Sequence, residues 1–252
     1  MIDSHTHLHY SGYSEIRDMS ISGITYAITC AVGTGASSLN TYRDEIENMI
    51  NLYWKLGESL GIKIYSAIGI HPANIPADWK EKLSSFEPYF NHEHVVAIGE
   101  VGINSERSVE DEVFYEMARL GKKYDLPLIV HTPFKDREKI VKKEIDILEK
   151  SGISPDIVVI DHVNMDIINT VKQGGYHIGL TVKEGRLTPE DVYKNIEIYE
   201  DGMLNSDVAN LGPSDPLSVP KTVQYLRSRG IKYDTINRIS HENAAKFYRR
   251  LR

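Results

Sequence analysis

Short apolar runs alternate with amphipathic segments along the whole chain. The amphipathic segments place apolar residues at helical spacing, which predicts helices at 14–20, 41–60, 79–90, 109–124, 136–151, 188–200, 217–229 and 240–250. The runs between them are continuously apolar, as in parallel strands buried on both faces, and predict strands at 2–8, 25–32, 63–70, 95–99, 127–130, 157–160, 176–180 and 203–206. This order predicts an α/β fold, a single-domain (β/α)8 or TIM barrel over residues 1–252.

Several predicted helix ends carry signals of their own. Gly61 and Gly152 follow two of the helices, and glycine tolerates the left-handed conformation that is common at this position. Thr188 and Pro189 are typical of a helix start, with a capping hydroxyl followed by proline in the first helical position. These signals support the boundaries that the apolar pattern gives.

Composition narrows the class of protein. The 252 residues, 41% hydrophobic and 26% charged, are enough for one large core. The apolar runs fall far short of the roughly 18 residues that a membrane-spanning helix needs, and the first residues lack the pattern of a signal peptide. We therefore expect a cytoplasmic protein without a membrane partner. Cys30 is the only cysteine, which excludes an intramolecular disulfide and predicts a buried, inert thiol.

The charge balance limits the range of substrates. The formal net charge is −7, and no block of the chain is rich in lysine and arginine. This weighs against tight binding to long nucleic-acid duplexes, which usually requires a basic face. A phosphoester substrate is still compatible, because bound divalent cations can supply positive charge locally.

Potential metal ligands follow the predicted strands at regular intervals. His131 lies 31 residues after Glu100, and His162 lies 31 residues after His131. Asp207 comes 45 residues later, with the strand predicted at 176–180 in between. Because active-site groups of a (β/α)8 barrel lie where its strands end, these four side chains are expected to meet on one face.

The first predicted strand adds a pair of histidines. Alternation along an extended strand puts His5 and His7 on the same side, so that both imidazoles can face one ion. His9 is expected beyond the strand, in contact with substrate or solvent. Four imidazoles together with two carboxylates suit zinc, manganese or cobalt better than magnesium.

These motifs, in this order, resemble the TatD family of metal-dependent hydrolases in the amidohydrolase superfamily. The resemblance covers nearly the whole chain and rests on His5-Thr6-His7, Gly69-Ile70-His71-Pro72, Ile98-Gly99-Glu100-Val101-Gly102, Leu126-Pro127-Leu128-Ile129-Val130-His131 and Glu242-Asn243-Ala244-Ala245-Lys246-Phe247. It implies two divalent metal ions with Glu100 as the bridging ligand. One ion would be held by His5, His7, Glu100 and Asp207, and the other by Glu100, His131 and His162.

Four segments near the implied site depart from the family pattern. An acid and a threonine usually precede the aspartate at the eighth strand, where this chain has Asn205 and Ser206. Asn104 replaces an aspartate that is common after the Gly-Glu-x-Gly segment. The segment after His131 lacks an arginine, and no phenylalanine-rich turn follows His162. The metal ligands therefore resemble the family, whereas the substrate pocket is expected to differ.

The resemblance implies hydrolysis of an ester bond, above all in a phosphoester, with a DNase or 3′–5′ exonuclease activity as one specific form. Two cations about 3.5–4 Å apart can lower the pKa of a shared water and stabilise charge on the attacked centre. Asp207 is then the catalytic residue that accepts and returns the proton. His71, Lys183 and Arg186 are expected to bind the substrate, a small phosphoester or short nucleic acid. No obligate protein partner is implied.

Three other interpretations stay open. The same metal chemistry can hydrolyse a small amide, a lactone or a carboxylic ester. A non-catalytic metal-binding protein would carry the same ligands but show no turnover. Phosphoesterases of the polymerase and histidinol phosphatase type also begin with paired histidines, but they typically bind three metals, so that counting bound ions distinguishes them.

Overall fold

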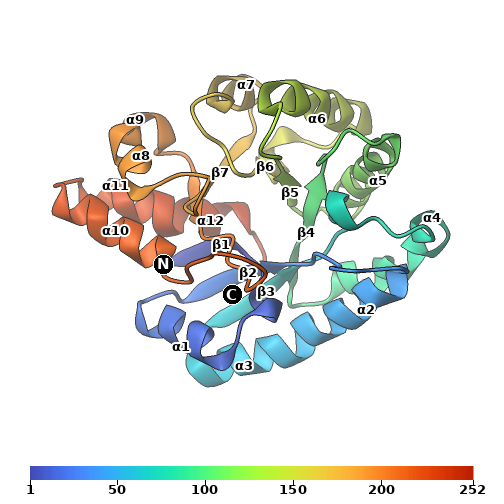
Figure 1. Cartoon of the computed structure of the whole chain (residues 1–252), viewed down its shortest axis with the longest axis horizontal. Helices are drawn as coiled ribbons and strands as arrows, with labels where there is room; N and C mark the ends of the chain where they lie inside the picture. Colours follow the sequence, from blue (N-terminus) through green and yellow to red (C-terminus); the bar gives the residue numbers. More distant parts are fainter. Residues whose placement is uncertain (252) are drawn as a thin grey trace.

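The computed structural model describes residues 1–251, and its centre is one sheet of eight strands in the order β1 to β8 (Figure 1). The strands are β1 (Ile2–Thr6), β2 (Tyr26–Cys30), β3 (Lys63–Ala67), β4 (Val95–Gly102), β5 (Leu128–His131), β6 (Val158–Ile160), β7 (His177–Thr181) and β8 (Met203–Asn205). Each strand pairs in parallel with the next one along the chain. The carboxyl ends of all the strands therefore lie at the same end of the barrel.

Helices surround the strands on the outside (Figure 1). The α-helices are α1 (Tyr13–Ile21), α2 (Leu39–Glu47), α3 (Trp54–Leu60), α4 (Trp79–Lys82), α5 (Ser108–Tyr124), α6 (Arg137–Ser151), α7 (Ile168–Gln173), α8 (Pro189–Lys194), α9 (Ile196–Tyr199), α10 (Ser218–Ser228), α11 (Tyr233–Asn237) and α12 (Asn243–Phe247). Short 3-10 or π segments are η1 (Leu8–Tyr10), η2 (Asn48–Tyr53), η3 (Pro72–Asn74), η4 (Leu83–Asn91), η5 (Pro155–Ile157) and η6 (Arg238–Glu242). The alternation confirms the predicted TIM barrel.

Backbone hydrogen bonds join the ends of the first and last strands. The amide of His7 donates to the carbonyl of Val208 at 2.7 Å, and the amide of Asp207 donates to the carbonyl of His5 at 3.0 Å. These bonds close the barrel beside its carboxyl-terminal face. They also bring three predicted metal ligands together from opposite ends of the chain.

The buried apolar side chains form two clusters. The larger lies between the sheet and the helices and includes Ile64 and Leu128. The smaller contains strand residues that alternate with these, such as Tyr65 and Ile129, and therefore face the barrel interior. Cys30 belongs to the smaller cluster, which confirms the predicted burial, and this burial raises the pKa of its thiol to about 11.

The strand that carries Glu100 is longer than its apolar run predicts. β4 continues to Gly102 because Val101 and Gly102 still pair with Val130 and His131 of β5. The prediction that Glu100 follows this strand was therefore wrong, since it lies within β4. Its side chain is nevertheless close to the end of the strand, where the other candidate ligands gather.

Two helical segments differ from the predicted pattern. The helix predicted at 41–60 contains a π-helical segment, η2, between α2 and α3. The sequence did not predict α7, because its only buried residues, Ile168 and Val171, give too short a periodic signal. Within residues 1–251, no helix combines the length and apolar character that crossing a membrane requires.

Candidate metal centre

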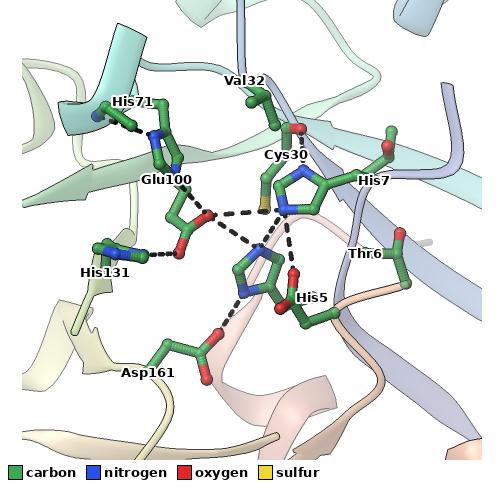
Figure 2. A network of polar contacts seen from close by, with 12 residues as sticks. His5, Thr6, His7, Cys30, Val32, His71, Glu100, His131 and Asp161 are labelled. Carbon is green, nitrogen blue, oxygen red and sulfur yellow. Dashed lines mark hydrogen bonds and ion pairs between the residues drawn. The ribbon is translucent and has the colours of Figure 1, made fainter. Parts of the chain in front are cut away.

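Glu100 occupies the middle of a buried cluster of histidines (Figure 2). Its Oε1 lies 2.7 Å from Nδ1 of His131 and 3.1 Å from Nε2 of His162. Its Oε2 lies 3.4 Å from Nε2 of His5 and 3.6 Å from Nε2 of His7. One oxygen of this carboxylate therefore faces His131 and His162, whereas the other faces His5 and His7 and also lies 3.4 Å from Nε2 of His71.

The paired histidines of the first strand converge as their spacing predicts. Nε2 of His5 lies 3.2 Å from Nε2 of His7, and the latter lies 3.2 Å from Oδ1 of Asp207. Figure 2 shows both rings pointing toward Glu100 from β1 and the residue after it. Nitrogen and oxygen atoms from both ends of the chain thus meet within one small volume.

Three overlapping groups of side chains place their ligand atoms within 4.8 Å of one another. The groups are His5, His7 and Glu100; His5, Asp161 and His162; and His71, Glu100 and His131. They contain every predicted metal ligand except Asp207, which joins the cluster through its contact with His7.

In three of these histidines, the hydrogen bond made by Nδ1 determines that Nε2 carries the lone pair. Nδ1 of His7 donates to the carbonyl of Cys30 at 2.8 Å, and Nδ1 of His5 donates to the carboxylate of Asp161. Nδ1 of His162 donates to Oγ1 of Thr181 at 2.7 Å. Each Nε2 is then unprotonated in the neutral ring and directed at the cluster. Metal-binding histidines typically have such partners, so the donor set fits divalent cations.

His131 is oriented the other way round. Its Nδ1 faces Glu100, while its Nε2 lies 3.3 Å from Oδ1 of Asn104 and can donate to it. The substitution of Asn104 for an aspartate therefore retains a hydrogen-bond acceptor for this ring. The lone pair of Nδ1 is left for the cluster.

Asp161, which the sequence did not single out as a site residue, supports both sides of the cluster. Besides His5, this buried carboxylate accepts hydrogen bonds from the His162 amide at 2.7 Å, Asn205 Nδ2 at 2.9 Å and Thr181 Oγ1 at 3.3 Å. The available signal was its charge directly after the apolar run of β6. Apart from His162, however, its partners come from β1, β7 and β8, and the register of these strands is not visible in the sequence.

Electrostatic pairing dominates the cluster. Burial alone raises the pKa of Glu100, but His5 and His131 hold that pKa well below its usual value. Burial likewise opposes the charge on His7, yet the hydrogen bonds that its ring donates to Asp207 and Glu100 raise its pKa to about 9. In this arrangement, protons on imidazoles compensate carboxylates. A bound cation would take over that compensation and release the protons.

Two candidate ligands have a left-handed backbone. The φ angle is 58° at His162 and 45° at Asp207, although neither is glycine. Non-glycine residues in this region are uncommon and concentrate at functional sites. Both are held through their backbone amides, which donate to Oδ1 of Asp161 and to the carbonyl of His5, respectively.

The three predicted substrate-binding residues differ in their surroundings. Nε2 of His71 lies 3.4 Å from Oε2 of Glu100, so His71 lies inside the cluster. Nζ of Lys183 lies 2.9 Å from Oδ2 of Asp207 and donates to the Asp207 carbonyl at 2.8 Å. Arg186 has its guanidinium carbon 3.7 Å from the ring centre of Phe134.

His9 lies apart from the candidate ligands. It belongs to η1, beyond β1, and its Nε2 lies 2.9 Å from Oε1 of Glu45. Its Nδ1 lies 3.1 Å from Oγ1 of Thr29. Its position beyond the strand is therefore confirmed, and its polar partners are protein side chains.

Comparisons of sequence place the chain among known proteins. The family model described as TatD related DNase matches residues 2–249. An uncharacterized metal-dependent hydrolase of Methanocaldococcus jannaschii is 33% identical, over 99% of this chain and 100% of its own. The uncharacterized metal-dependent hydrolase TatD of Mycobacterium tuberculosis is 24% identical, over 90% of this chain and 89% of its own.

Solved structures show the same relationship. A TatD-like protein of Archaeoglobus fulgidus superposes with a TM-score of 0.82 and 30% identity, over 99% of this chain and 100% of the other. The phosphotriesterase homology protein of Escherichia coli, solved with phosphate in its active site, shares the fold, with a TM-score of 0.74, 15% identity and 98% of both chains covered. This protein thus belongs to the TatD-related family of metal-dependent hydrolases.

Proposed function

We propose that this protein hydrolyses a phosphoester with two divalent cations, one on each side of Glu100. The observation that carries the proposal is the division of the Glu100 carboxylate: Oε1 faces His131 and His162, whereas Oε2 faces His5 and His7, with His71 beside it. Imidazole nitrogens together with carboxylate oxygens favour zinc, manganese or cobalt over magnesium. The proposed ligands are those that the sequence predicts: His5, His7, Glu100, His131, His162 and Asp207.

The cations would lower the pKa of the attacking water and stabilise the charge that develops on the phosphoryl oxygens. The residues of the chain supply orientation and proton transfer. The oxygen of water forms a bond to phosphorus while the bond from phosphorus to the leaving alcohol oxygen breaks. The proton released by the water is passed to that leaving oxygen.

Asp207 is the proposed carrier of this proton. Burial raises the pKa of Asp207, but the hydrogen bond from His7 and the nearby charges of His162 and His5 lower it below its usual value. Asp207 is therefore ionised at neutral pH, as a group that accepts a proton must be. Lys183 holds its other oxygen, so we assign Lys183 to positioning Asp207 as well as to the substrate side of the site.

The class of phosphoester is the finer part of the proposal. The family description, TatD related DNase, supports a nucleic-acid end or a smaller phosphodiester as the substrate. His71 lies beside Glu100 and can donate a hydrogen bond to a substrate oxygen. Amide, lactone and carboxylic-ester substrates are the alternatives that the experiment must separate.

A substrate panel tests this function. Protein reconstituted with manganese, zinc or cobalt should hydrolyse bis-p-nitrophenyl phosphate and short single-stranded DNA faster than amides, lactones or carboxylic esters. Turnover of only amides, lactones or carboxylic esters, with two ions bound per chain, would reject the phosphoesterase proposal in favour of hydrolysis of that class of substrate. Three bound ions by elemental analysis would favour a centre of the polymerase and histidinol phosphatase type.

Replacing Asp207 by asparagine tests the catalytic assignment. Loss of a positioned acid–base group typically lowers the rate about 10²–10⁴-fold. We expect a loss of this size with an unchanged circular dichroism spectrum. Full activity in the variant would remove Asp207 from the proton transfer, whereas absence of turnover in the unmodified protein on every panel would indicate a non-catalytic metal-binding protein.

A further inference from the structure

Two arginines near the metal cluster lack a carboxylate partner. Arg137 begins α6, and Arg186 lies in the loop between β7 and α8. Within residues 1–251, neither forms an ion pair, whereas Arg107, Arg119 and Arg238 each pair with a glutamate. Both guanidinium groups are partly buried.

The contacts of the two guanidinium groups leave donors unused. Nη2 of Arg137 donates to the carbonyl of His162, and Nη1 of Arg186 lies 3.4 Å from the carbonyl of Pro133. The Nε atoms of both arginines are buried and have no hydrogen-bond partner. The face of the Arg186 guanidinium stacks on Phe134, which fixes its plane while its edge keeps free donors.

The contacts of the two arginines place them beside the cluster, because Arg137 donates to the carbonyl of the candidate ligand His162 and Arg186 lies against the carbonyl of Pro133, two residues after His131. Burial and the neighbouring charge of Arg137 lower the pKa of Arg186 to about 10, and Asp207 is among the groups that oppose this shift. Arg186 therefore stays protonated at neutral pH, beside both Arg137 and the candidate ligands.

An oxyanion is the ligand that satisfies such a pair. The planar edge of a guanidinium donates two parallel hydrogen bonds to phosphate oxygens, and phosphate can accept from two such edges at once. Binding would satisfy the unused donors and reduce the repulsion between the two cations. A neutral substrate would leave the buried donors without partners and would not reduce the repulsion between the two cations.

We propose that Arg137 and Arg186 form an anion subsite that binds a second, non-reacting phosphate of the substrate. This inference rests on the proposed phosphoester hydrolysis and makes its substrate class narrower. The preferred substrate carries another phosphate close to the scissile one, as an oligonucleotide with phosphorylated ends does. A phosphodiester with a single phosphate would occupy the metal cluster alone.

Paired substrates test the subsite in the metal-loaded protein. A thymidine dinucleotide phosphorylated at both ends is compared with the same dinucleotide carrying hydroxyl groups at both ends. We expect the unmodified protein to have the higher kcat/KM for the phosphorylated form. Arg186→Gln and Arg137→Gln should each lower this preference about tenfold, as expected when a hydrogen-bonded charge contact is lost. Arg186→Lys should recover only part of it, because lysine lacks the planar edge.

Lys142→Gln is the matched control for loss of one positive charge. Lys142 lies on the exposed side of α6, paired with Glu138, and its replacement should leave the preference unchanged. Thermal melting of each variant identifies any that do not fold. The arginine variants that do fold then test the subsite. A preference that is the same in the unmodified protein and in the folded arginine variants overturns the subsite.

Calorimetric titration separates failure of the subsite from failure of the proposed function. Inorganic phosphate should bind the metal-loaded protein about tenfold more tightly than it binds Arg186→Gln, as expected for a lost charged hydrogen bond. Equal affinities would show that phosphate binds only at the metals and would overturn the subsite. A difference in affinity without any phosphodiester turnover would retain the subsite and reject the phosphoesterase. Tighter binding of succinate than of phosphate would reject a phosphate ligand.

Discussion

Asp161 connects the two sides of the candidate metal centre. Its carboxylate accepts hydrogen bonds from the ring of His5 and from the amide of His162. Although burial raises the pKa of Asp161, the charges of His162 and His5 lower it to about 2, so the group is ionised at neutral pH. Asp161 thereby holds a ligand of each proposed ion in place.

Asp161→Asn should weaken metal binding about 10–100-fold, the usual cost of losing a partner that orients a metal-binding histidine. The amide that replaces the carboxylate has a single acceptor oxygen for four donors. Titration calorimetry with Mn²⁺ or Zn²⁺ measures the change. Asp146→Asn, on the exposed surface of α6, is the control and should bind metal normally. Equal affinities in the two variants would mean that Asp161 does not support the ligands.

The sequence predicts the residues at the centre of the cluster, but not the residues that orient them through hydrogen bonds. His5 and His7 were predictable from the alternation of side chains along β1, and Glu100, His131 and His162 from their regular spacing near the carboxyl ends of β4, β5 and β6. Asp161 and Thr181 act through side-chain hydrogen bonds across β6 and β7. These bonds depend on the register of neighbouring strands, which no local pattern encodes.

At the scale of the element, β7 supplies none of the proposed metal ligands, but its Gly179 leaves room for the side chain of Asp161. A Cβ atom on Gly179 would lie well under 3.0 Å from Oδ1 of Asp161, closer than real contacts allow. Absence of a side chain at this position therefore lets the Asp161 carboxylate reach its partners.

Gly179→Ala should destabilise the protein by about 2 kcal/mol, a typical cost of overpacking a buried site. It should also weaken metal binding, because Asp161 must move. Urea denaturation measures the free energy of unfolding. Gly212→Ala serves as the control, since a Cβ atom on Gly212 would have no neighbour within 4 Å. Unchanged stability and affinity in Gly179→Ala would contradict the packing account.

A buried glutamate ties α6 to the loop after β4. Oε1 of Glu144 accepts a hydrogen bond from the Ile103 amide at 3.0 Å, while Oε2 is buried without a partner. Burial raises the pKa of Glu144 well above 4.5. The folded state therefore retains a proton that the unfolded chain releases above pH 4.5, so this group reduces stability as pH rises toward its folded pKa.

Glu144→Gln removes the titratable group and therefore the loss of stability that it causes as pH rises. Relative to the unmodified protein, the variant should become progressively more stable as pH rises from 4.5 toward neutrality. Denaturation curves at several pH values give the difference. Glu138→Gln changes an exposed residue of the same helix, and its difference should vary little with pH. A flat difference for Glu144→Gln would indicate that Glu144 is not protonated in the folded protein.

Elements were predictable wherever the periodic signal was long. All eight strands were expected close to their observed positions, as were the helices α5, α6 and α10. β4 was predicted too short because the polar Glu100 interrupts its apolar run, although pairing with β5 continues. The short helices α7 and α11 have too few apolar residues to stand out.

The whole molecule should be stabilised by its metals. A ligand that binds only the folded state adds about 2.7 kcal/mol at a concentration 100 times its Kd. For a domain of this size, that corresponds to a rise in Tm of roughly 5–10 °C. Differential scanning calorimetry with and without a chelator measures it, and zinc, manganese or cobalt should act at lower concentration than magnesium. An unchanged Tm at saturating metal would contradict binding to the folded barrel.

The barrel as a whole followed from the alternation of apolar and amphipathic segments, but the substrate did not. Arg137 begins the helix after β5 and Arg186 lies in the loop after β7, and only the fold places them near each other. Phe134, which lies in the segment where the family pattern contains an arginine, contacts the guanidinium of Arg186. Specificity therefore depends on loop contacts that have no periodic signature.

Anomalous X-ray diffraction from crystals grown with Mn²⁺ most directly tests the central claim that Glu100 bridges two cations. We expect two peaks, one beside each carboxylate oxygen, about 3.5–4 Å apart. The first should contact His5, His7 and Asp207, and the second His131 and His162. A single peak, or two peaks that do not share Glu100, would contradict the account.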